Sequence, residues 1–252
     1  MKISIITVCF NSEETIRDTI TSIESQSYDD IEYIVVDGGS TDKTFELVKK
    51  SPIVTYSVSE PDDGIYDAMN KGIRMATGDI IGILNADDFY ADKDVLSQVS
   101  KSFEMQSIDA VYADLVYVNQ KLTKKVVRLW KSKAYTTDLF KQAWVPPHPT
   151  FFVRKRVYDE FGMFKLKYQL AADFELLFRM IEVKKINTVY LPKILVKMRI
   201  GGATNSNLSN IIKQNKEIVS VLKAHYDDFS TIKWASYKLF DRITQFIKSN
   251  KL

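Results

Sequence analysis

The sequence predicts an α/β fold, in which a mostly parallel, Rossmann-like sheet is flanked by helices. In the first 115 residues, short apolar runs alternate with segments whose apolar residues recur every three or four positions. Such runs, without a polar face, are typical of parallel strands that are covered on both sides. Four of the runs end in polar clusters: "CFN", "DGGSTD", "SEPDDG" and "NADD". Because open α/β sheets bind ligands outside the carboxyl ends of their strands, we expect these clusters to form one ligand-binding rim.

The first half alternates strands and helices. Strands are expected at residues 3–10, 33–36, 54–58, 80–84 and 110–113. Three helices are expected between these strands from their apolar faces: the first carries Ile16, Ile20 and Ile23, the second Phe45 and Val48, and the third Ile65, Met69, Ile73 and Ala76. A fourth helix is expected at residues 95–103. Asn11 or Ser12 is the expected cap of the first helix, and Ser40 or Thr41 that of the second.

The second half is more mixed. A hairpin is expected from residues 111–118 and 125–130, followed by a strand at 150–153 and a short helix around Tyr158. The next helix is expected from the apolar stripe Phe174, Leu177, Phe178 and Ile181. A strand at 188–199, a flexible loop at Gly201 and Gly202, and helices at 208–226 and 232–247 complete the chain. No internal repeat or Pro-rich linker separates the halves, so we expect them to share one core.

Composition excludes some classes of function. The 252 residues carry a formal net charge of +3, which is too small to argue for nucleic acid as a partner. The single cysteine, Cys9, fits a reducing compartment, and the first apolar run reaches acidic residues without a signal-peptide cleavage site. No window approaches the roughly 18 apolar residues of a membrane span. We therefore expect a cytoplasmic protein.

Asp37 is the first candidate site residue. It follows the apolar run 33–36 and opens the turn "DGGST". Ser40 and Thr41 are explained equally well as helix caps, but a cap does not explain Asp37. A carboxylate there would be placed to accept a hydrogen bond from a base or a ribose, and Thr7 and Asn11 on the neighbouring strand would face the same ligand.

The segment "NADD" (residues 85–88) is the second candidate. Adjacent carboxylates repel each other, so Asp87 and Asp88 need a counter-charge if they are buried. A divalent cation supplies one, since Mg²⁺ typically takes one or two carboxylates and completes its shell with water and substrate phosphates. The alternative is an exposed acidic turn in which Asp88 caps the next helix. Asn85 offers a carbonyl oxygen to a metal or a hydrogen bond to a ribose.

Two other segments give weaker signals. "GIYDAMNKG" contains Tyr66, Asn70 and Lys71, and this lysine is placed either to neutralise a diphosphate or on a solvated helix face. Asp173 begins an otherwise apolar helix, where an acid is common for structural reasons. In a cleft, the same carboxylate would serve as a general base.

Together these segments resemble the inverting nucleotide-sugar glycosyltransferases of family 2, which have the GT-A fold. The resemblance rests on "ISIITVCFNSEETI", "IEYIVVDGGSTDKT", "GIYDAMNKGIRMATGDIIGILNADD" and "AADFELLFR", in the order and spacing of the family. "SEPDDGIYDAMNKGI" and "NADDF" further resemble the bacterial branch that builds capsule, O-antigen and colanic-acid-like polysaccharides. The resemblance implies one GT-A domain over residues 1–228, with a nucleotide-binding half (1–115) and an acceptor-side half (116–228).

The resemblance also implies roles for individual residues. A pocket for the base and ribose would be lined by Thr7, Asn11 and Asp37, and the nucleotide and diphosphate would be flanked by Tyr66, Asn70 and Lys71. Asn85, Ala86 and Asp87 occupy the family's DxD position, with Asp87 as the ligand of Mg²⁺ or Mn²⁺ and Asp88 as a supporting acid. Asp173 would deprotonate the acceptor, a hydroxyl of a glycan or lipid-linked saccharide, in a single inverting displacement. The donor would be a nucleotide sugar, with UDP favoured by frequency in the family.

Three positions depart from the family pattern. Asn85 replaces the first Asp of DxD, and Ala172 replaces the Glu that usually precedes the base. Gly201 and Gly202 stand where many relatives carry a metal-binding His. His148, in "WVPPHPTFF", is the other candidate metal ligand, although a proline-flanked His is more often a turn or core residue.

The departures keep two alternatives open. One is a non-catalytic relative that binds nucleotide sugars or glycans, against which the presence of both Asp87 and Asp173 argues. The other is a sugar nucleotidyltransferase, whose Gly-rich, Arg-containing phosphate loop has no counterpart in "CFNSEET".

Residues 229–252 form a predicted basic amphipathic helix. Its apolar stripe consists of Ile232, Leu239, Phe240, Ile243, Phe246 and Ile247. Five basic residues stand against one acid, Asp241, and Trp234 and Tyr237 lie off the stripe. The helix either packs on the domain with a solvated basic face, or lies on an anionic membrane and holds the protein at the inner face of the cell membrane.

Overall fold

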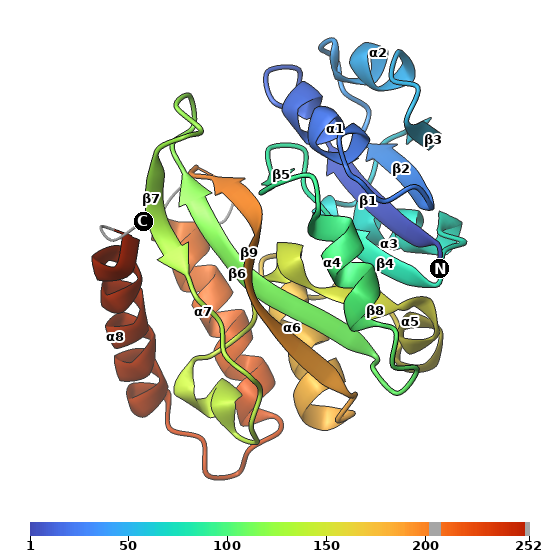
Figure 1. Ribbon diagram of the computed structural model, residues 1–252. Coiled ribbons are helices and arrows are strands. Elements are labelled where there is room, and N and C mark those ends of the chain that lie inside the picture. The colour runs from blue at the N-terminus through green and yellow to red at the C-terminus, as the bar shows by residue number, and fades with distance from the viewer. Residues whose placement is uncertain (202–207, 250–252) are drawn as a thin grey trace.

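The computed structural model describes residues 1–201 and 208–249, and the side chains of all of these except 244–249. It contains one nine-stranded sheet in the order β3-β2-β1-β4-β8-β6-β9-β5, with β7 paired to β6 (Figure 1). Strands from both halves of the chain belong to this sheet. The α/β class and the flanking helices predicted from the sequence are therefore confirmed.

The first half contains four parallel strands. These are β1 (Ile3–Cys9), β2 (Ile31–Asp37), β3 (Val54–Ser59) and β4 (Ile80–Ile83), and α1 (Ile16–Glu24), α2 (Thr44–Lys49), α3 (Ile65–Met75) and α4 (Val95–Ser102) accompany them. The predicted elements are confirmed, but the predicted caps are wrong. The residues before α1 and α2 are Thr15 and Lys43, and neither makes a side-chain cap. Ser40 instead donates to Asp37, so the hydroxyl supports a buried acid and not a helix end.

Five further strands complete the sheet. These are β5 (Phe89–Tyr90), β6 (Ala110–Val118), β7 (Val126–Trp130), β8 (Phe152–Arg154) and β9 (Thr188–Arg199). β8 is antiparallel to both β4 and β6, and β9 is parallel to β6. The carboxyl ends of β4, β6 and β9 therefore point to the same edge of the sheet. The predicted hairpin is β6–β7, and only the two-residue β5 was not expected.

The remaining helices lie in the second half of the chain and in its C-terminal segment. They are two 3₁₀ turns, η1 (Leu139–Gln142) and η2 (His148–Thr150), then α5 (Lys155–Phe161), α6 (Ala172–Phe178) with a π-helical extension η3 (Arg179–Val183), α7 (Leu208–Lys223) and α8 (Thr231–Ser249). Gly202 and the side chains of Phe246 and Ile247 lie outside the described residues. Among the described helices, none combines the length and the apolar character needed to span a bilayer.

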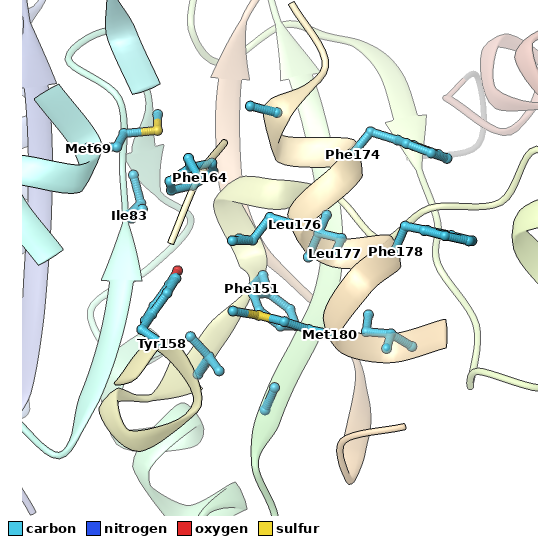
Figure 2. Close-up of a cluster of buried hydrophobic side chains, with 14 of the residues drawn as sticks. Met69, Ile83, Phe151, Tyr158, Phe164, Phe174, Leu176, Leu177, Phe178 and Met180 are labelled. Atoms are coloured by element: carbon cyan, nitrogen blue, oxygen red, sulfur yellow. The ribbon is translucent and has the colours of Figure 1, made fainter. Parts of the chain in front are cut away.

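The core is divided between the two faces of the sheet. Side chains alternate along a strand, so Ile6 and Val8 of β1 join one buried cluster while Ile3 and Ile5 join the other. Figure 2 shows the first cluster around α6, whose Phe174 and Phe178 extend to the same side of the helix. Both rings pack edge-to-face against Phe140. This packing fixes the helix that carries Asp173.

The other close contact that positions the rim is between α3 and β1. A Cβ atom on Gly72 would lie 2.4 Å from Ile6 Cγ2, so only glycine lets α3 come this close to the sheet. The first turn of α3, with Tyr66, is thereby held near the carboxyl ends of the strands.

Candidate functional site

The Asp37 carboxylate lies where β1, β2 and β3 end at the same level, because Cys9 pairs with Asp37 and Asp37 pairs with Ser59. It is fully buried. It accepts hydrogen bonds from the Ser40 amide (2.9 Å), the Ser40 hydroxyl (2.5 Å) and the Ser59 hydroxyl (2.6 Å). In this structure, Asp37 organises the turn "DGGST" from beneath.

Asn11 joins this turn to the neighbouring one. Its backbone is left-handed, with φ of 47°, a conformation that Asn tolerates better than most residues. The side-chain oxygen Oδ1 of Asn11 accepts from the Thr41 backbone amide (2.9 Å). The backbone amide of Asn11 donates to the Ser40 hydroxyl (2.8 Å). Asn11 is exposed at the rim, whereas Thr7 is buried within β1 and accepts from the Tyr33 hydroxyl (3.1 Å).

Phe10 was not anticipated as a site residue. Its ring is 61% exposed at the carboxyl end of β1. It lies against the β2–α2 turn, because a Cβ on Gly38 would be 3.6 Å from Phe10 Cδ2. An exposed aromatic face is a surface on which a nucleotide base stacks. The available signal was an aromatic residue at a strand end, just before the polar cluster.

The NADD segment leaves two acceptor oxygens without donors. Asp88 is completely buried and its Oδ2 accepts from Asn85 Nδ2 (3.2 Å). Asp88 Oδ1 and Asn85 Oδ1 are buried, and neither has a hydrogen-bond partner among the described residues. Ala86 between them is buried as well. Unpartnered carboxylate and amide oxygens are the chemistry that Mg²⁺ and Mn²⁺ select, so the residues present fit such an ion.

Burial disfavours the ionised form of both carboxylates of the NADD segment. Burial raises the pKa of Asp88 well above its ordinary value, and the neighbouring charge of Asp87 raises it further. Burial also raises the pKa of Asp87, while Arg199 acts in the opposite direction. A positive charge at this site would therefore favour the ionised pair.

Arg199 supplies part of that charge and was missed in the sequence. It ends β9, is 4% exposed, and donates to the Asp87 carbonyl oxygen (2.7 Å) and to the Asp18 carboxylate. Its guanidinium also lies 5.0 Å from the centre of the Phe89 ring. A basic residue at the end of an apolar strand was the only signal, and its partner is 112 positions away in the sequence.

Lys71 lies on α3 beside the loop after β3. Its Nζ is 3.0 Å from Glu60 Oε1 and 3.5 Å from Asp67 Oδ2. The hydrogen bond with Glu60 raises the pKa of Lys71. The Glu60 amide donates to the Asp37 carbonyl oxygen, which places this cation next to the Asp37 turn.

Asp173 lies in the first turn of α6 and is half-buried. Its Oδ1 accepts from the Tyr66 hydroxyl (3.1 Å) and from the Phe174 amide (2.8 Å). Burial, and next the charge of Asp173, raises the pKa of Tyr66, so the phenol stays a donor at neutral pH. The expected base and the first turn of α3 are thus brought into direct contact.

His148 and Asn70 lie around Phe164, next to this pair. The His148 ring packs edge-to-face on Phe164 at 5.5 Å, and burial lowers the pKa of His148. Asn70 is buried and uses both ends of its amide on the Phe164 backbone, each at 2.9 Å. Among the described residues, no three His, Cys, Asp or Glu side chains group as metal ligands. A metal at Asp87 would therefore have to complete its shell with substrate and water.

The segment leading into Asp173 is held at both ends by charged side chains. Arg179 donates to the carbonyl oxygens of Phe161, Gly162 (3.0 Å) and Met163 (2.7 Å). Glu217 of α7 accepts from the amides of Gln169 (3.2 Å), Leu170 (2.9 Å) and Ala171 (3.0 Å). The position of Asp173 thus depends on a helix that begins 35 residues after it in the sequence.

Comparison with known proteins adds the following. Residues 4–162 match the profile of the family described as glycosyl transferase family 2. A PGL/p-HBAD biosynthesis glycosyltransferase of Mycobacterium tuberculosis is 29% identical over 214 residues, which cover 81% of this chain and 79% of that protein. An uncharacterized glycosyltransferase of the same organism is 32% identical over 182 residues, covering 70% of this chain and 68% of the relative.

Solved structures share the fold. S. aureus TarS in complex with UDP aligns with a TM-score of 0.64 at 18% identity, over 88% of this chain but 65% of that one. A mannosyltransferase from Pyrobaculum calidifontis, in complex with GDP-Man and Mn²⁺, aligns with a TM-score of 0.67 at 19% identity, over 95% of this chain and 69% of that one. At these identities the likeness is one of fold.

Proposed function

This chain belongs to glycosyl transferase family 2, and we propose that it transfers a sugar from a nucleotide-sugar donor to an acceptor hydroxyl with inversion at the anomeric carbon. The observation that carries the proposal is the NADD segment. Its two buried, unpartnered oxygens stand beside Asp87 at the edge where β4, β6 and β9 end.

The donor would bind along the ends of β1 to β4. Phe10 offers a face for the base, and Asn11 and the Asp37 turn offer polar groups to the base and ribose. Lys71 is held positively charged by Glu60 and Asp67, and would compensate the negative charge of the diphosphate. The nucleotides in the structural neighbours, UDP and GDP-Man, support a nucleoside diphosphate sugar, and UDP is our choice between them.

Asp87 would hold the cation, with Asp88 and Asn85 behind it. When bound, Mg²⁺ or Mn²⁺ supplies Lewis-acid stabilisation of the departing diphosphate. Arg199 fixes the backbone of Asp87 through its carbonyl oxygen and so keeps the motif in place. The mannosyltransferase with Mn²⁺ supports a divalent ion in this role.

The acceptor would be activated by Asp173. As the acceptor oxygen forms its bond to the anomeric carbon, its proton passes to the Asp173 carboxylate. The bond from that carbon to the diphosphate breaks at the same time, and the electron pair leaves with the nucleoside diphosphate. One displacement from the opposite face inverts the configuration. Tyr66 orients the carboxylate by donating to Oδ1.

The acceptor class in this proposal is a glycan or a lipid-linked saccharide of bacterial surface polysaccharide synthesis, reached in the cytoplasm or at the inner face of the membrane. The relative from Mycobacterium tuberculosis that is named for PGL/p-HBAD biosynthesis supports a role in a bacterial biosynthetic pathway.

Donor binding is tested by thermal unfolding with UDP, GDP and UDP-sugars, with and without Mn²⁺. A ligand at 100 times its dissociation constant adds about 2.7 kcal/mol to the free energy of unfolding. We expect one nucleotide series to stabilise the protein, and more so with the ion. If none of these nucleotides raises the melting temperature, the donor site is wrong.

Replacing Asp173 by Asn separates binding from chemistry. The amide oxygen still accepts from Tyr66, so donor-induced stabilisation should be unchanged, while transfer should fall by about 10²–10⁴-fold. Asp227→Asn removes an exposed carboxylate and is the matched control. Turnover by Asp173→Asn at the wild-type rate would exclude Asp173 as the base.

A further inference from the structure

Helix α8 attaches to the domain by the side opposite to its apolar stripe. Trp234 is 4% exposed and belongs to the same core cluster as Phe174 and Phe178 of α6. Lys238, one turn further on, lies over the Trp234 ring and donates to Asn215 of α7 (2.6 Å). Burial lowers the pKa of this lysine to about 8. α8 lies along β7 at the side of the molecule, next to α7 (Figure 1).

The apolar stripe consequently faces away from the protein. Ile232 is 81% exposed, Leu239 64%, Phe240 70% and Ile243 52%. Positions 232, 239 and 243 are separated by seven and four residues, so they lie on one face of the helix. The two expectations for this helix are not exclusive, because a helix packed by Trp234 still presents its stripe to the outside.

The charge of this segment selects the occupant. Residues 229–252 contain five Lys or Arg and one Asp, whereas the rest of the chain has 30 basic and 31 acidic residues. The positive excess of the protein therefore resides in the segment that carries the exposed stripe. A second copy, packed helix against helix, would bring two such segments together at a cost in repulsion. Lys238 is taken up by Asn215 and Trp234, but the segment keeps a positive excess without it; an anionic bilayer attracts that excess and accepts the apolar side chains.

We propose that the outward face of α8, formed by Ile232, Leu239, Phe240 and Ile243, docks on an anionic lipid surface with the helix in the plane of the interface. The buried contacts of Trp234 and Lys238 hold the domain at a fixed orientation above the lipid. If the proposed function is right, this surface gives access to a lipid-linked acceptor, but docking itself requires neither donor nor acceptor.

The test is flotation of the full chain with vesicles of phosphatidylcholine, with and without phosphatidylglycerol, at low and high salt. We expect the wild-type protein to float with the anionic vesicles at low salt only. Leu239→Ser combined with Phe240→Ser should weaken this binding by about tenfold or more, since two exposed apolar side chains no longer enter the interface. Met105→Ser combined with Leu122→Ser is the matched control, because both of these side chains are 67% exposed and lie off α8.

Three results would overturn the proposal. The first is absence of the wild-type protein from anionic vesicles at low salt, and the second is equal binding by both double variants. The third is a wild-type dimer in light scattering that the α8 double variant converts to a monomer without any vesicle binding, which would assign the face to a second copy. Donor-induced stabilisation, measured in parallel without vesicles, shows separately whether the proposed transferase site is intact.

Discussion

Asn85 and Asp88 share one hydrogen bond, and each keeps a buried oxygen to which no group in the described part of the chain donates. The amide at residue 85 therefore does what a second carboxylate could not: it donates to a buried acid. This gives the departure from the family pattern a structural reason. With an amide at residue 85, the NADD segment avoids the repulsion that a third carboxylate beside Asp87 and Asp88 would cause when no cation is bound.

Asn85→Asp tests this account. Without metal, the new carboxylate would face Asp88 and lower the free energy of unfolding by about 1–3 kcal/mol, since a donor to a buried acid is lost. With Mn²⁺ and UDP, the extra charge should enlarge the ion-dependent rise in melting temperature. Thermal unfolding with and without the ion measures both effects. Asn119→Asp, which adds the same charge in the β6–β7 turn, should show neither. Equal ion dependence in Asn85→Asp and the wild-type protein would contradict the account.

At this scale, sequence reasoning found the polar residues of the rim but not all of their partners. Asp87 and Asp88 follow an apolar strand, which was a local signal of burial and of a missing counter-charge. Arg199 gave no comparable signal, because its contact with Asp87 depends on the pairing of β9 with β5, the short strand that follows the NADD segment. For Asn70 the sequence suggested a place near the nucleotide, whereas in the structure its amide is taken up by the Phe164 backbone. That expectation stays a prediction without present structural support.

The elements were more predictable than the contacts between them. The strand at Thr188–Arg199 was predicted at its full length, since its periodicity and the following glycines define both ends. The helix caps were not, because the Ser40 hydroxyl accepts from the Asn11 backbone amide and donates to Asp37, and the Ser12 hydroxyl donates to the Phe10 carbonyl oxygen. The π-helical turn after α6 was not predicted either, since residues 179–183 continue the apolar periodicity of the helix before them.

The contact between α7 and the segment before α6 predicts a positioning role for Glu217. Glu217→Ala frees three backbone amides ahead of Asp173, and we expect kcat to fall by about 10–100-fold, as small displacements of a reacting group can cost this much. KM for the nucleotide sugar should be unchanged, because the donor side does not depend on this loop. Glu217→Gln keeps an acceptor oxygen and should restore part of the rate.

Steady-state kinetics with a saturating acceptor provide this measurement. Glu46→Ala, which removes an exposed carboxylate paired with Lys50, is the control. A purely structural role would lower the melting temperature of Glu217→Ala without separating kcat from KM. Wild-type kcat in Glu217→Ala would rule out positioning by this residue.

For the whole molecule, the unexpected result is the orientation of α8. Amphipathic periodicity shows which residues share a face but not which face meets the domain. Trp234 lies outside the apolar stripe, and yet it is the residue that enters the core. The side of α8 that carries the large aromatic residue Trp234 meets the domain, although the other side carries four apolar residues.

Deletion of residues 229–252 should therefore destabilise the domain itself. The loss of a buried Trp alone costs about 3–5 kcal/mol, a large part of the 5–15 kcal/mol that stabilises a typical domain. Urea unfolding should show a lower midpoint for the shortened chain and an unchanged one for Leu239→Ser combined with Phe240→Ser. A shortened chain as stable as the wild type would mean that α8 is not an integral part of the core.

The double hydrogen bond between Asn70 and Phe164 has a consequence for motion. It ties α3, which the proposed function places on the donor side, to the segment that leads into α6, which the same proposal places on the acceptor side. Tyr66 and Asp173 add a second tie between the same two parts. Any hinge opening between the halves would have to break all three hydrogen bonds, and the two made by Asn70 are buried. We therefore expect donor and acceptor to bind to parts of the protein whose relative position is already fixed. Any rearrangement during turnover should be confined to segments that these hydrogen bonds do not join.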